Sequence, residues 1–219
     1  VGGVITTITG SEKIWTSNPV ANTYEDSPVE LGVRFSSGTS GFVKGIRFFS
    51  ANNVSGTYTG HLWTADGNLL ASAVFTNVTA NGWQEVLFSE PVKIEAGVIY
   101  VASYYNSSGI YAATSQGLSQ PVNNGNSLTT LTNDGKAPGG VYTYNGPGFP
   151  TQTYNATNYW VDVVFTTGQS EFKLSSVTDS IGCSITGDLQ TLMVTPTPCD
   201  QQRQGLMTQS APTQKPVLV

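Results

Sequence analysis

Tyrosine is the residue type whose spacing in this chain points most directly to chemistry. The segment from Asn106 to Asn158 is rich in Gly, Asn, Ser and Thr and carries four of the ten tyrosines. Sugar rings stack their C–H faces on aromatic rings, while amides and hydroxyls bond the sugar hydroxyls. We therefore predict a glycan-binding surface, formed by Tyr105, Tyr111, Tyr142, Tyr144 and Tyr154. The alternative is that these rings pack the segment onto a sheet and leave their hydroxyls in water.

Carboxylates in turns are the second group that could do chemistry. Hard cations bind carboxylates and loop carbonyls. Glu25 and Asp26 stand in a turn before Pro28, and Asp134 stands between Asn133 and Gly135. No Asp-x-Asp-x-Asp pattern accompanies them. The sequence predicts no definite cofactor, and Ca²⁺ is the ion that these carboxylates would suit.

Catalysis lacks the usual parts. His61 is the only histidine, so neither a Ser-His-Asp triad nor a histidine-based zinc site can be assembled. We expect it to be a surface or cross-strand side chain. A carboxylate pair for glycoside cleavage is formally possible, but no pair stands out, and we expect Asp162 to face Arg34 across paired strands. The sequence predicts a protein that is not an enzyme.

Composition narrows the location and the partners. Only 11% of residues are charged and the net charge is −5, without a Lys/Arg cluster that could neutralise phosphates, so no nucleic-acid partner is expected. No apolar run approaches the ~20 residues that span a bilayer. The abundance of Thr and Asn favours a secreted or surface protein. In such a compartment Cys183 and Cys199 are predicted to form a disulfide; two independent thiols are the alternative.

Alternating apolar residues predict strands throughout the first three quarters of the chain. Leu31, Val33 and Phe35 alternate in one run, and residues 159–165 alternate in another. Residues 65–68, Ala-Asp-Gly-Asn, predict a tight hairpin turn. Short strands are expected near residues 110–113 and 141–144. Many short strands separated by turn signals, without helical periodicity, indicate a sandwich or jelly roll.

Ordered motifs along this region carry a family resemblance. Glu30-Leu-Gly-Val-Arg-Phe, Gly45-Ile-Arg-Phe-Phe, Thr59-Gly-His-Leu-Trp-Thr, Gly82-Trp-Gln-Glu-Val and Asn158-Tyr-Trp-Val-Asp-Val-Val-Phe are among them. Together they resemble the bacterial domain family DUF4082 over about residues 14–166. The resemblance implies a jelly-roll-like antiparallel β-sandwich in a large secreted or surface protein. It implies no activity, because the function of the family is not established.

The segment after Gly168 carries a second, shorter resemblance. Residues 172–183 and 187–195 are similar to the last two strands of the immunoglobulin-like repeats in surface proteins of Bacteroidota. A full domain of that kind needs ~100 residues, so an incomplete immunoglobulin-like appendage is expected. Asp179-Ser180-Ile181 also resembles the O-glycosylation acceptor of the same bacteria, which would make Ser180 a modification site.

We expect four parts: an N-terminal arm (1–13), the β-sandwich (14–166), the partial immunoglobulin-like strands (167–199) and an extended tail (200–219). Apolar residues near both ends are candidates for strand addition between subunits. These assembly residues are Val4, Ile5, Ile8, Val217, Leu218 and Val219. The leading hypothesis is a non-catalytic extracellular structural or adhesive protein that binds copies of itself in a filament or surface layer. The alternative is a carbohydrate-binding module of a larger secreted protein.

Overall fold

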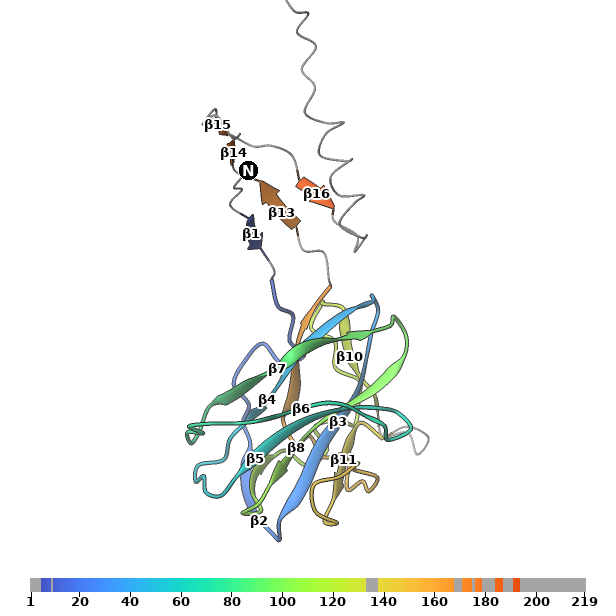
Figure 1. The fold of residues 1–219 in the computed structure, drawn as a ribbon. Coiled ribbons are helices and arrows are strands. Elements are labelled where there is room, and N and C mark those ends of the chain that lie inside the picture. The colour runs from blue at the N-terminus through green and yellow to red at the C-terminus, as the bar shows by residue number, and fades with distance from the viewer. Residues whose placement is uncertain are drawn as a thin grey trace, which may run out of the picture. The chain divides into compact units, whose positions relative to one another are not determined.

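A computed structural model gives the fold (Figure 1). It describes residues 5–8, 10–132 and 138–167, together with four short strands between residues 171 and 193. The chain divides into a larger unit, residues 10–168, and a smaller one made of residues 1–9 and 169–219. Every regular element among the described residues is a strand, and the sheets are antiparallel. The predicted all-β antiparallel sandwich is confirmed.

The larger unit contains two main sheets and a two-stranded ribbon. The six-stranded sheet has the order β10-β3-β8-β5-β6, with β11 also paired to β3. Its strands are β3 (Val29–Ser37), β5 (Tyr58–Thr64), β6 (Leu69–Val74), β8 (Ile99–Asn106), β10 (Leu128–Thr130) and β11 (Gly140–Thr143). The three-stranded sheet, β12-β4-β7, is made of β4 (Gly41–Phe49), β7 (Trp83–Ile94) and β12 (Val161–Thr166). The ribbon pairs β2 (Asn22–Glu25) with β9 (Ile110–Ala113).

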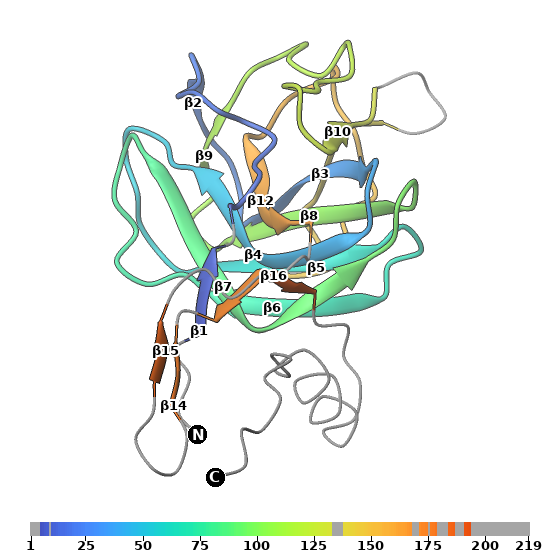
Figure 2. The ribbon, with the colours of Figure 1, turned by 90° about the horizontal axis from the view of Figure 1, so that it is seen from above.

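The core lies between the two main sheets. Leu31, Val33 and Phe35 point from β3 into it, and Val163 and Phe165 enter it from β12; all five are buried. Their period of two places alternate side chains on one face of each strand. Figures 1 and 2 show β4 and β7 lying over β5 and β6. The alternation seen in the sequence is therefore the signal of the core faces.

Local predictions are confirmed at three places. The Asp-Gly turn joins β5 to β6, with Gly67 at φ +89°. Strands do punctuate the long polar segment, at Ile110–Ala113 and Gly140–Thr143. One long-range prediction is wrong, because Arg34 does not face Asp162. β12 pairs with β4 rather than β3, and this register places Asp162 opposite Arg47.

The smaller unit contains a three-stranded sheet and a hairpin. The sheet has the order β1-β13-β16, formed by β1 (Ile5–Ile8), β13 (Glu171–Leu174) and β16 (Thr191–Met193). The hairpin pairs β14 (Ser176–Thr178) with β15 (Ser184–Thr186). The N-terminal strand is thus paired within its own chain, with Ile5 opposite Leu174. Several predicted residues lie outside the described ones: Val4, Asp134, Ser180, Cys183, Cys199, Val217, Leu218 and Val219.

Candidate functional site: a tyrosine-lined pocket

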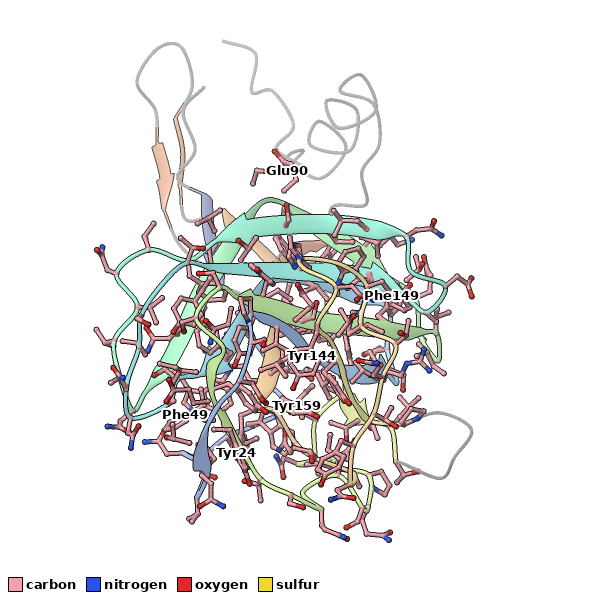
Figure 3. All side chains as sticks on the ribbon, turned by 90° about the horizontal axis from the view of Figure 1, so that it is seen from below. Tyr24, Phe49, Glu90, Tyr144, Phe149 and Tyr159 are labelled. Atoms are coloured by element: carbon pink, nitrogen blue, oxygen red, sulfur yellow. The ribbon has the colours of Figure 1, made fainter. Side chains whose placement is uncertain are left out.

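A cavity of about 480 Å³ opens beside the β2–β9 ribbon of the larger unit. This volume falls within the ~300–1,000 Å³ typical of small-molecule pockets. We call it the tyrosine pocket. It is lined by Tyr24, Asp26, Leu31, Tyr111, Ala113, Ser115, Tyr142, Tyr144, Tyr154, Asn155, Thr157 and Tyr159. Figure 3 looks at this side of the unit, where Tyr24, Tyr159 and Tyr144 follow one another.

The floor of the pocket belongs to the core, and its rim reaches solvent. Leu31 from β3, Ala113 from β9 and Tyr159 are buried. By contrast, Tyr144 is 45% exposed and Tyr154 is 62% exposed. A ligand could therefore rest on fixed core residues and still touch rings that water reaches.

Pairing of distant strands brings the tyrosines together. Tyr24 on β2 lies opposite Tyr111 on β9, and their rings stack with centroids 5.7 Å apart. Tyr142 on β11 meets Tyr144 and Tyr159 edge to face, at interplanar angles of 70° and 64°. Edge-to-face contacts of this kind are an arrangement that aromatic pairs prefer.

Asp26 is the acidic member of the pocket. Tyr111 and Tyr144 each donate a hydroxyl hydrogen bond to its Oδ2 atom, both at 2.9 Å. Burial raises the pKa of Tyr111, and the Asp26 carboxylate raises it further. The same two causes raise the pKa of Tyr144 to about 12. Both phenols therefore stay protonated at neutral pH and act as donors that fix the carboxylate.

A glycine explains why Asp26 sits at this position. Gly109 has φ +74°, and its carbonyl accepts a hydrogen bond from the Asp26 N–H at 2.9 Å. A Cβ atom at Gly109 would lie 2.1 Å from the Asp26 carbonyl oxygen. Only glycine combines this left-handed conformation with so close an approach. The turn before β9 thus holds the acidic group beside the tyrosines.

The loop on the other side of the pocket has an unusual backbone. Asn155 and Ala156 both have positive φ, at 45° and 46°. Gln116, also at positive φ, donates its N–H to the Asn155 carbonyl, and Leu118 donates to the Ala156 carbonyl. Such conformations cost about 1–3 kcal/mol each and persist where surrounding contacts hold them, often at ligand sites. The loop is therefore fixed by its neighbours before any ligand arrives.

The structure brings four of the five tyrosines predicted to bind glycans into this pocket. Tyr105, the fifth, lies on β8 outside the lining. Sequence reasoning missed Tyr24 and Tyr159, and it assigned Asp26 to a metal rather than to this cluster. The missing signal was the pairing of β2 with β9, which joins segments far apart in the chain.

A metal site finds no support in the described part of the chain. Asp26 is bonded by two phenols, and Glu25 ends β2 outside the pocket lining. Among the described residues, no group of three or more His, Cys, Asp or Glu side chains is arranged to hold a metal ion.

His61 belongs to a different polar cluster, on the six-stranded sheet. It is buried, not on the surface, and its Nδ1 lies 2.9 Å from Oε1 of Glu30. Ser103 donates its hydroxyl to the same Oε1 at 2.5 Å and accepts a hydrogen bond from Trp63. The carboxylate thus stands between serine and histidine, whereas activation of a serine nucleophile needs the histidine in the middle. Burial raises the pKa of Glu30.

The fold and the pocket define a β-sandwich protein with a ligand-sized aromatic cavity. Residues 16–161 match DUF4082, described as a domain of unknown function, and the chain belongs to this family. Every residue that lines the tyrosine pocket lies within the matched range. No curated protein matches the chain. No helix among the residues that the structure describes is long and apolar enough to cross a membrane.

Proposed function

We propose that this chain is a secreted, non-catalytic binding module whose tyrosine pocket holds a sugar residue of a surface or extracellular glycan. The observation that carries the proposal is the gathering of tyrosine rings around one cavity of suitable volume. A pyranose ring offers C–H faces to such rings. Its hydroxyls would meet the Asp26 carboxylate, the Asn155 amide, and the hydroxyls of Ser115 and Thr157, all of which line the cavity.

Charge narrows the class of glycan. The lining contains no lysine, arginine or histidine, and Asp26 is its only carboxylate. A sulfated or carboxylated sugar would meet the like charge of a carboxylate without a cation to pair with, which disfavours its binding. The proposal is therefore limited to sugars without negative charge.

A glycan array probed with the 219-residue chain tests the proposal. Tyr144→Ala and Tyr154→Ala each remove an exposed ring from the rim of the pocket. We expect each change to lower the affinity for a glycan by about tenfold, or ~1.4 kcal/mol. Tyr105→Ala removes a tyrosine outside the pocket and should leave binding unchanged. An array without hits, or hits that ignore both rim variants, would refute the proposal.

Self-association through terminal strands is the second candidate. β1 stands at the outer end of the β1-β13-β16 sheet, so one of its edges has no strand partner among the described residues. An open edge can accept a strand from another chain. Negative-stain imaging should show filaments from the full chain that vanish when residues 200–219 are deleted. A variant with these residues in scrambled order is the control, and compact single particles from all three proteins would exclude assembly.

A further inference from the structure

Asp26 gives the tyrosine pocket an acidic side chain to which a neutral sugar offers hydroxyls but no opposite charge. Its side chain is the only acidic one in the lining, which contains no lysine, arginine or histidine. Two phenols bond the same oxygen, Oδ2, and no hydrogen bond reaches Oδ1 from the described residues. The side chain is therefore held in one orientation with an acceptor to spare.

The rings around Asp26 reinforce its negative potential. The face of a tyrosine ring carries the negative part of its quadrupole and attracts cations within about 6 Å of its centroid. Tyr111 and Tyr159 meet at 66° with centroids 6.0 Å apart, and Tyr142 meets Tyr159 at 64°. Tyrosine rings at steep angles to one another therefore line one cavity together with a carboxylate. Quaternary ammonium and methyl-lysine groups are bound by aromatic cages of this composition.

We propose that the ligand of the tyrosine pocket carries an ammonium group, and that it is an amino sugar whose amine is free rather than acetylated. This inference rests on the proposed function. The sugar ring supplies C–H faces to the tyrosines. Its ammonium group donates charge-assisted hydrogen bonds to Asp26, which are about twice as strong as neutral ones. A neutral or N-acetylated sugar of the same shape lacks this pair.

Matched sugars that differ at one position test the proposal. Calorimetry on the 219-residue chain compares gluco, galacto and manno sugars, each with a free amine, an N-acetyl group or a hydroxyl at carbon 2. Choline is an additional probe, because it shares the cationic charge but has no sugar ring and no N–H donor. We expect at least one free-amine sugar to bind about tenfold or more tighter than both of its matched partners.

Two variants assign this preference to the pocket. Asp26→Asn keeps the shape of the side chain but removes its charge, and should abolish the preference for the free amine. Glu25→Gln makes the same charge change at the adjacent exposed residue, outside the lining, and should keep the preference. Added salt should weaken free-amine binding more than binding of the hydroxyl sugar, since it screens the ion pair.

The outcomes separate this inference from the proposed function. If the three forms of each sugar bind equally, or if Asp26→Asn retains the preference, the ammonium inference is overturned and glycan binding stands. Choline binding as tight as the best amino sugar would support ammonium recognition but overturn the sugar as its source. If nothing in the panel binds, both proposals fail.

Discussion

Removing the buried carboxylate of Asp162 should lower the free energy of unfolding of the sandwich more than removing a partly exposed carboxylate does. The side chain is fully buried, and its Oδ2 lies 2.6 Å from Nη2 of Arg47, which is itself buried. Arg47 also donates from Nε at 2.8 Å. The backbone N–H groups of Ile14 and Trp15 donate to the same carboxylate, at 2.8 and 3.1 Å. One side chain therefore ties two strands to the segment that leads into the sandwich.

The magnitude follows from this geometry. Asp162→Ala leaves the Arg47 charge buried without its partner, which costs about 3–5 kcal/mol. At about 2–4 °C per kcal/mol for a protein of this size, the melting temperature should fall by about 6–20 °C. Glu85→Ala is the control, because its ion pair with Lys13 is partly exposed and should cost only about 0.2–1 kcal/mol.

Urea unfolding followed by tryptophan fluorescence measures both changes. Trp15 reports the loss directly, since its backbone N–H donates to Asp162 and its ring centroid lies 4.9 Å from that of Trp160. Replacing Arg47 and Asp162 together by Met and Leu should recover part of the loss, because no buried charge is left. Recovery should stay incomplete, because the N–H of Ile14 also loses its acceptor. An Asp162→Ala protein within about 1 kcal/mol of wild type would refute this account.

Two further predictions concern a buried acid and a turn. Burial raises the pKa of Glu30 above 4.5, so its stabilising contribution is complete below that pH and is lost as the pH rises through the folded-state pKa. Glu30→Gln, which does not titrate, should therefore gain stability relative to wild type as the pH rises above 4.5 in thermal melts. A stability difference that stays constant with pH would contradict this. Gly109→Ala places a Cβ on a residue with left-handed φ and against the Asp26 backbone. Its loss of unfolding free energy should therefore exceed the ~1–2 kcal/mol of the conformation alone. The same change should weaken ligand binding, because it displaces Asp26. Gly125→Ala, at φ +79° with no atom within 4 Å, isolates the conformational cost, and equal losses in urea unfolding would exclude the clash.

The fold could be predicted because alternation is a local signal. The alternation of Leu31, Val33 and Phe35 predicts a buried strand face, and the Asp-Gly turn after Thr64 predicts a hairpin; both are present in the structure. Alternation states which face of a strand is buried but not which strand lies beside it. For this reason the prediction from the sequence placed Asp162 opposite Arg34, whereas in the sheet it lies opposite Arg47.

The sequence was enough to predict that tyrosines form the candidate site, but not to predict all the residues that line it. Tyr111, Tyr142, Tyr144 and Tyr154 share a polar segment that is too long for an idle loop, and this drew attention to them. Asp26 and Tyr24 lie beside these tyrosines because β2 pairs with β9. Residues 22–26 contain no local pattern from which that strand pairing could be predicted. Long-range pairing, rather than local propensity, creates the pocket.

The most direct measurement is the position of a bound sugar on the protein. We would label the tyrosine rings of the 219-residue chain with ¹³C, add the glycan that binds most tightly on the array and follow each ring by NMR. The account predicts that the signals of Tyr24, Tyr144 and Tyr154 move on saturation, while that of Tyr105 stays in place. A tightly bound sugar that leaves the three pocket rings unchanged would contradict the central claim, because its site would lie elsewhere on the molecule.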